Sequence, residues 1–164
     1  LLNHAPEICL ILNSSVNAYR RLDPHFEAPN QIKVSAIDRG SMIRIPTANE
    51  RTARIEVRSV APAANPYMVL YILLRTGLEG QKLEKDTSKR DRLRFLPDNI
   101  NDAIALMKAS KFITGILGED SKEKFISYKQ AAADRSPKAL GKSIKKSEVI
   151  FHHEVTNQLL WNSF

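Results

Sequence analysis

The sequence is poor in the features that mark secreted and membrane proteins. It has one cysteine, Cys9, which cannot form an internal disulfide, so we expect a reducing compartment and a cytoplasmic location. Its apolar runs fall short of the roughly 18 residues that a membrane span needs, and no membrane contact is predicted. The opening "LLNHAPE" has no basic region and no cleavage site of small residues, so it does not read as a signal peptide.

The sequence also has fewer acidic than basic residues. Eighteen acidic residues stand against 25 lysines and arginines, a formal net charge of +7, which favours an anionic partner. The most basic segment, 81–94, has six basic and three acidic residues but no aromatic side chain on which a base could stack. We therefore interpret 81–94 as a solvated loop and expect no nucleic-acid partner.

The chain has the length of one globular domain, with 43% hydrophobic and 26% charged residues. It starts at Leu1 inside an apolar periodic segment, so we expect a piece of a longer protein. An incomplete chain of this kind is expected to carry an incomplete site.

The hydrophobic pattern predicts helices and strands in separate parts of the chain. One or two helical stretches are expected in 1–22, interrupted near "NSS", with Cys9 in the core. Strands are expected at 31–37, 41–47 and 53–60, and their short connections favour antiparallel pairing. An apolar helix follows in "YMVLYILLRTGLEG", ended by Gly77 or Gly80.

The carboxy-terminal half is predicted to be helical, which makes the fold class α+β. The segment "LPDNINDAIALMKASKFITGILG" is expected to form a helix capped by Asp98 or Asn99, followed by a long amphipathic stretch to Phe164. His152 and His153 are adjacent, so on a helix they point about 100° apart and do not suit one metal ion.

Charged residues alternate with apolar ones in "ARIEVRS". In a strand this pattern places Arg54, Glu56 and Arg58 on one face and turns Ile55 and Val57 toward a core. Neighbours on that face lie about 6.6 Å apart, which suits gripping an anion or a metal better than tight pairing along the strand. The alternative is a solvated face whose charges compensate one another.

More arginines precede this strand, and they favour a phosphate and carboxylate site. The guanidinium group is always charged and binds such oxygens in pairs, and a carboxylate among phosphate-binding arginines is how Mg²⁺ is usually held. Glu56 would supply one of the six oxygens that Mg²⁺ requires. The arginines within 39–58 are Arg39, Arg44, Arg51, Arg54 and Arg58.

Several segments resemble one family in order and spacing. "NSSVNAYRRLDPHFEAP", "DRGSMIRIP", "RIEVRS" and "AANPYMVLYILLRTGLEG" are similar to the carboxy-terminal half of the catalytic domain of glutamine synthetase. The resemblance is strong to about Gly80 and weaker beyond it. It implies that residues 1–164 are part of this catalytic domain, with an antiparallel sheet segment followed by a helical carboxy-terminal half.

The resemblance also implies an activity and a set of residue roles. The parent would be an ATP-dependent glutamate–ammonia ligase that works through γ-glutamyl phosphate with Mg²⁺ or Mn²⁺, in a ring-shaped homo-oligomer with sites between subunits. The implied roles are glutamate contact for Arg21 and Arg58, flap closure and proton removal for Glu27, contact with both phosphate and glutamate for Arg39, ATP phosphate binding for Arg44, Arg51 and Arg54, and metal ligation for Glu56.

The chain departs from the family pattern in three places. Asp38, Arg39 and Gly40 stand where relatives have "NRS" or "NRT". "KRDRLRFLP" offers no counterpart of the tyrosine that some bacterial relatives carry for adenylylation. The other metal-binding glutamates, the histidine motif of the nucleotide site and the amino-terminal β domain are absent from these residues, so the fragment alone is expected to be inactive.

Two alternatives stay open. One is a related ligase that joins glutamate to another amine, such as a polyamine or methylamine. The other is a non-catalytic truncated paralogue, which has no need to retain the arginines together with Glu27 and Glu56.

Overall fold

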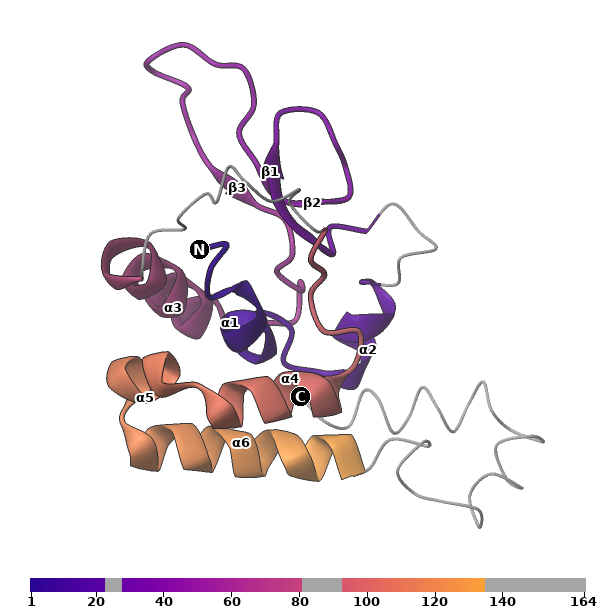
Figure 1. The fold of residues 1–164 in the computed structure, drawn as a ribbon, viewed down its shortest axis with the longest axis vertical. Coiled ribbons are helices and arrows are strands. Elements are labelled where there is room, and N and C mark those ends of the chain that lie inside the picture. The colour runs from indigo at the N-terminus through magenta and orange to yellow at the C-terminus, as the bar shows by residue number, and fades with distance from the viewer. Residues whose placement is uncertain (23–27, 81–92, 135–164) are drawn as a thin grey trace, which may run out of the picture.

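The computed structural model describes residues 1–22, 28–80 and 93–134, and within these residues it has an α+β fold with one small sheet and six helices. Figure 1 shows the sheet and its loops at one end, α4, α5 and α6 at the other, and α1 between them. The predicted fold class is therefore confirmed. The elements are α1 Ala5–Leu12, α2 Val16–Arg20, β1 Gln31–Ser35, β2 Ser41–Arg44, β3 Glu56–Val57, α3 Pro66–Glu79, α4 Ile100–Ala109, α5 Lys111–Leu117 and α6 Glu119–Asp134.

Helix α1 forms the centre of the core. Pro6 lies in its first turn, where proline costs the helix nothing, and six of its eight residues are buried. It packs against α3 and α4, and Ile8, Cys9 and Leu10 are completely buried. The core position predicted for Cys9 is confirmed, and the break near "NSS" separates α1 from α2 as expected.

The sheet has the order β1-β2-β3 and is mixed. Strands β2 and β3 are antiparallel, as predicted, with Arg44 opposite Glu56. Strands β1 and β2 are parallel, with Gln31 opposite Ser41 and Ser35 opposite Arg44, so the expectation of antiparallel pairing was wrong for this pair.

The connection between β1 and β2 explains the difference. The Ser35 hydroxyl accepts the backbone N–H groups of Ile37 (3.2 Å) and Asp38 (3.0 Å), and an Asp38 carboxylate oxygen accepts the Gly40 N–H (2.8 Å). These side-chain turns bring the chain back along β1, so that the Gln31 N–H donates to the Gly40 carbonyl (3.0 Å) and β2 starts beside the start of β1. A short connection between two strands therefore does not always make an antiparallel hairpin.

The predicted helix after "AANP" is confirmed as α3. The Asn65 side chain accepts the N–H groups of Tyr67 and Met68 and caps its start, and Gly80, rather than Gly77, follows its last residue. The helix expected around 97–118 is instead two helices. Ser110 ends α4 and caps α5 by accepting the Ile113 N–H (3.1 Å), which breaks the helix at that point.

Completely buried isoleucines should set the stability of this fold. We expect Ile8→Ala to lower the free energy of unfolding by about 2–5 kcal/mol, because it leaves a cavity beside α1. Ile37→Ala is the matched control, since Ile37 is 89% exposed and should change the free energy by less than about 0.5 kcal/mol. Urea denaturation of both variants checks this, and equal effects would contradict the assigned core.

Candidate functional site

Glu56 lies between two arginine side chains at the edge of the sheet. Arg44, opposite it on β2, donates from Nε to Glu56 Oε2 (2.7 Å) and from Nη2 to Oε1 (3.0 Å), which is a two-pronged ion pair. Arg54 donates from Nε (2.9 Å) and approaches with Nη2 (2.7 Å) the same oxygen, Oε1. Both carboxylate oxygens of Glu56 are therefore bound to guanidinium groups.

These contacts hold Glu56 in its ionised form. Hydrogen bonding from Arg44 lowers the pKa of Glu56, and Arg54 lowers it further. The same contacts raise the pKa of Arg44. The three side chains are 28–52% exposed, so solvent screens the attraction and their charges remain open to a ligand.

Two details of the predicted strand were wrong. Arg54 and Glu56 do pair tightly along the chain, because the long arginine side chain spans the distance between neighbours on one face. Ile55 is 61% exposed rather than turned into the core, since β3 contains only Glu56 and Val57. Val57 packs against the core as expected.

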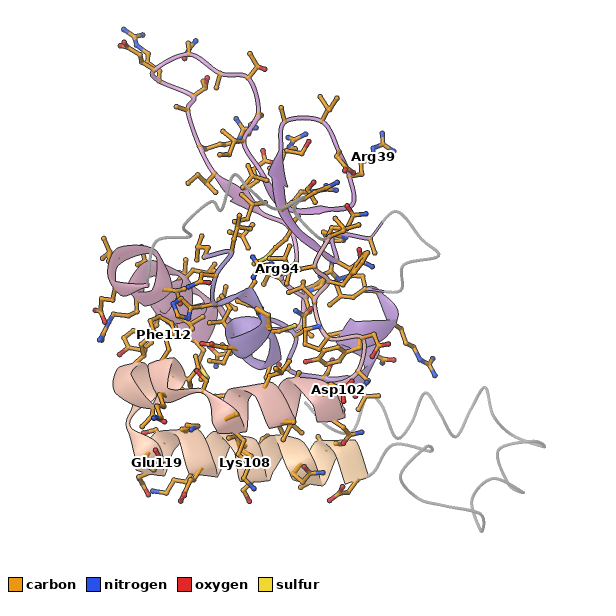
Figure 2. The ribbon with its side chains drawn as sticks, in the orientation of Figure 1. Arg39, Arg94, Asp102, Lys108, Phe112 and Glu119 are labelled. Carbon is orange, nitrogen blue, oxygen red and sulfur yellow. The ribbon has the colours of Figure 1, made fainter. Side chains whose placement is uncertain are left out.

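Arg58 joins this cluster to the loop between β1 and β2. Its Nη1 donates to the Arg39 carbonyl (2.7 Å) and more weakly to the Asp38 carbonyl (3.4 Å). Figure 2 shows Arg39 on that loop, on the side of the sheet away from the helices. The contact joins the Arg58 side chain to the backbone of Arg39 and so brings these two residues together.

Arg21 approaches Arg58 from the end of α2. Its Nη1 donates to the Arg58 carbonyl (3.3 Å), while its Nε and Nη2 are buried without a hydrogen-bond partner within the described structure. Burial, and next the charge of Arg58, lower the pKa of Arg21. A partly buried guanidinium group whose Nε and Nη2 have no acceptor among the described residues is suited to a carboxylate ligand.

One predicted site residue, Arg51, is not part of this cluster. Arg51 is exposed in the loop between β2 and β3, and among the described residues no hydrogen bond or ion pair joins its side chain to Glu56. Glu27 lies outside the described residues, as do the segment 81–92 and the histidines at 152 and 153.

The described residues do not complete a metal site by themselves. They include no group of three or more histidine, cysteine, aspartate or glutamate side chains that could hold a metal ion. Glu56 has the hard oxygen donors that Mg²⁺ prefers, but it could offer only part of the coordination shell. Other ligands would have to come from elsewhere.

Asp38 is a site residue that the sequence reasoning did not assign. Its carboxylate pairs with Lys33 Nζ (2.5 Å) and accepts the Gly40 N–H, and these two contacts lower its pKa. Together with Arg58 it shapes the loop that carries Arg39. The Asp-x-Gly spacing signals such a turn, but only the fold shows that Lys33 and Arg58 lie beside it.

Comparison with known families identifies the family to which the chain belongs. The sequence model of the family described as "Glutamine synthetase, catalytic domain" matches residues 1–144. The chain belongs to the glutamine synthetase family. The resemblance drawn from the sequence is thereby confirmed.

Relatives with curated names agree with this assignment. Glutamine synthetase of Methanosarcina mazei is 40% identical, over 73% of this chain and 30% of the relative. That of Halobacterium salinarum is 34% identical, over 79% of this chain and 32% of the relative. The chain thus spans about a third of the length of these relatives.

A solved structure shows the same fold. The structure titled "GmaS/ADP complex-Conformation 1" superimposes with a TM-score of 0.63 at 31% sequence identity, covering 80% of this chain and 33% of that one. Its unliganded form, "Apo GmaS without ligand", gives 0.62. The arrangement of helices and sheet is therefore that of the glutamine synthetase family.

The ion pairs of Glu56 should make stability depend on pH. Because the pKa of Glu56 is lowered in the folded protein, its contribution is present above the unfolded-state pKa of about 4.3 and is lost as the pH falls through the folded-state pKa. Glu56→Gln should therefore be less stable than wild type near pH 7, and the two should converge below about pH 4.

Urea denaturation across this pH range measures the difference. Glu50→Gln is the control, because Glu50 is exposed in the loop between β2 and β3. If the difference in the free energy of unfolding between wild type and Glu56→Gln does not decrease as the pH is lowered, the result would contradict the ion pairs.

Proposed function

We propose that the intact protein carrying this chain is an ATP-dependent ligase that forms glutamine from glutamate and ammonia through γ-glutamyl phosphate. The single observation that carries the proposal is the Glu56 carboxylate held between Arg44 and Arg54, next to the Arg21 and Arg58 pair. Family membership and the names of the relatives support it. We also propose that residues 1–164 form part of the catalytic domain and are inactive alone.

The part of the sheet that carries Arg44, Arg54 and Glu56, which we call the arginine face, suits phosphoryl transfer. The transferred group carries charge on several oxygens, and catalysis consists mainly of positioning it and neutralising that charge. Arg44 and Arg54 are partly exposed and strongly charged, so their guanidinium groups can turn toward ATP phosphates. Arg39 and, at the loop, Arg51 would extend the same positive surface.

Glutamate would bind beside the Arg21 side chain. The buried Nε and Nη2 of Arg21 have no acceptor within residues 1–22, 28–80 and 93–134, and a substrate carboxylate offers the pair of oxygens that fits them. The Arg58 side chain donates a hydrogen bond to the Arg39 carbonyl. The residues that would contact glutamate and phosphate are therefore held at a fixed distance from one another. This connection would keep the γ-carboxylate of glutamate in line with the phosphate to be transferred.

Glu56 would hold a divalent cation, Mg²⁺ or Mn²⁺, with further ligands from outside the described residues. When bound, the cation supplies charge neutralisation at the transferred phosphate. Arg44 and Arg54 keep Glu56 ionised, and the carboxylate oxygens would become available to the cation as the two guanidinium groups turn toward phosphate. Glu27, on the proposed flap, would close the site and remove a proton from the ammonia adduct.

Location and assembly follow the same proposal. Among the residues that the structure covers, no helix is long and apolar enough to cross a bilayer. We propose a cytoplasmic, ring-shaped homo-oligomer with sites between subunits, as the family resemblance implies.

A second candidate is ligation of glutamate to another amine. Asp38 stands where the family pattern has asparagine, and its ionised carboxylate lies in the loop that Arg58 contacts. Asp38, with its Lys33 partner, therefore changes the shape and charge beside Arg39, and a different choice of amine would arise at this position. Activity with ammonia, methylamine and a polyamine, compared in wild type and Asp38→Asn, separates the two candidates.

Loss of the Glu56 carboxylate should stop turnover. We expect Glu56→Ala in the intact protein to lower metal-dependent glutamine formation by about a hundredfold or more, since the cation loses a ligand, while the folded structure is retained. Steady-state assays over a range of Mg²⁺ concentrations, with circular dichroism as the folding control, measure this. Unchanged activity would contradict the assignment of Glu56 as a metal ligand. Glu50→Ala is the matched control, because Glu50 is exposed.

Arg21 should act on glutamate rather than on ATP. Arg21→Lys keeps the positive charge but removes the planar pair of donors, so we expect KM for glutamate to rise about tenfold while KM for ATP changes little. Arg20→Lys is the control, because Arg20 is the neighbouring exposed arginine. Equal rises in both KM values would argue against a glutamate contact at Arg21.

A further inference from the structure

Gly40 lies directly against the side chain of Gln31. A Cβ atom at position 40 would stand 3.0 Å from Gln31 Nε2, 3.3 Å from Gln31 Cδ and 3.3 Å from Asp38 Oδ1. These distances are shorter than most contacts that a Cβ atom makes, so a larger residue would have to displace the Gln31 side chain or the loop by a few tenths of an ångström. The space beside Gly40 is therefore filled by Gln31.

The close approach of Gln31, and not the backbone conformation, accounts for glycine at position 40. Among the described glycines only Gly118 has a positive φ, so the φ value of Gly40 is one that other residues also adopt. Gly77 offers the contrast, because a Cβ atom there would meet nothing within 4 Å. Position 40 is thus restricted by a neighbouring side chain.

Gln31 is a firm point of reference because its backbone is paired on both sides. It lies opposite Ser41 of β2 on one side and opposite Phe95 on the other. On the Phe95 side the next residue, Ile32, donates its N–H to the Arg94 carbonyl (2.8 Å). Gln31 cannot shift without the loss of such backbone bonds, so the loop adapts to Gln31 rather than the reverse.

The loop between β1 and β2 carries Arg39 immediately before Gly40. Arg39 is exposed, and Figure 2 shows it on this loop, away from the helices. Its carbonyl accepts from Arg58 Nη1 (2.7 Å), and the following residue, Gly40, is placed by the contact with Gln31. A small shift at Gly40 would redirect the long side chain of Arg39, because the two residues share one peptide bond.

The contact between Gln31 and Gly40 is one of shape. Gln31 Oε1 is buried and has no hydrogen-bond partner among the described residues, so this atom does not tie the side chain to the loop. The hydroxyl of Ser41, the residue opposite Gln31, is likewise buried without a partner there. Volume, rather than a hydrogen bond from these atoms, is what Gln31 contributes to the position of the loop.

We propose that Gln31 is a positioning residue: its side chain packs against Gly40 and thereby sets the place of Arg39 in the candidate site. The inference rests on the proposed function, in which Arg39 contacts both ATP phosphate and glutamate. Phosphoryl transfer requires the charged groups around the transferred phosphate to be placed to within a fraction of an ångström. Gln31 therefore affects turnover without touching either substrate.

Reciprocal substitution in the intact protein tests the proposal. Gly40→Ala adds the obstructing Cβ atom, Gln31→Ala removes the side chain that this atom would meet, and the double variant combines the two changes. Gly77→Ala is the matched control, since it also adds one methyl group to a glycine but into open space. The measurements are kcat for glutamate-dependent ADP release, Kd for ATP and the thermal unfolding midpoint.

We expect each single variant to lower kcat about fivefold to tenfold and the double variant to recover to within about threefold of wild type, because the added methyl group takes up part of the lost volume. Gly77→Ala should keep the wild-type kcat. A role in stability alone would lower the unfolding midpoint and leave kcat of the folded protein unchanged, and this result would overturn the proposal. So would effects on kcat that multiply in the double variant instead of offsetting each other.

Gln31→Met separates positioning from contact with a substrate, and it keeps the test decisive if Gly40→Ala does not fold. Methionine has nearly the volume of glutamine but no amide, so most of the kcat that is lost in Gln31→Ala should be retained in Gln31→Met if Gln31 acts by packing. A loss as large as that of Gln31→Ala would mean that the amide itself contacts a substrate, and the positioning role would be wrong.

ATP affinity distinguishes failure of this inference from failure of the proposed ligase. A wild type without glutamate-dependent ADP release refutes the ligase. The Gln31 assignment then stands if Kd for ATP rises about fivefold in Gly40→Ala and recovers in the double variant, and it is refuted if the Kd values are equal. An active wild type whose kcat and Kd are matched by all variants refutes the Gln31 assignment alone, and a wild type that neither binds ATP nor releases ADP refutes both.

Discussion

The burial of α1 is the constraint on which the rest of the structure depends. The helix is packed by α3 and α4, and the Ala61 N–H after the sheet donates to its Leu12 carbonyl (2.9 Å). Glu7 accepts from the Ser110 hydroxyl (2.9 Å) at the junction of α4 and α5 and contacts His4 (3.0 Å). The sheet and the helical layer are thus both attached to one buried helix, and the arginine face rests on that support.

The candidate site is built on an excess of positive charge that the fold only partly neutralises. Glu56 compensates Arg44 and Arg54. Arg58 and Arg21 donate to backbone carbonyls, and Arg21 Nε and Nη2 have no acceptor among the described residues. Such an arrangement is tolerable at a partly exposed sheet edge and becomes favourable when an anion binds. The same residues thereby connect local packing with the chemistry proposed for the intact protein.

Local signals predicted much of this fold, and long-range contacts account for what they missed. The cap at Asn99, the end of α3 at one of its two glycines and the core position of Cys9 follow from short patterns that need no partner. The parallel pairing of β1 with β2 does not, because it depends on side-chain turns at Ser35 and Asp38 that reverse the chain. In the site, residue types and spacing indicated the arginines and Glu56, but not which guanidinium groups bind the carboxylate, since that is decided by the register of two strands.

The most direct test of the account is the release of ADP by the protein as its source cells make it. The account predicts that ADP forms from ATP only when glutamate, a divalent cation and an amine are all present, with glutamine as the product when the amine is ammonia. A protein that binds ATP and glutamate but forms no ADP under any of these conditions would contradict a ligase, and it would make the truncated, non-catalytic paralogue the better explanation of the arginine face.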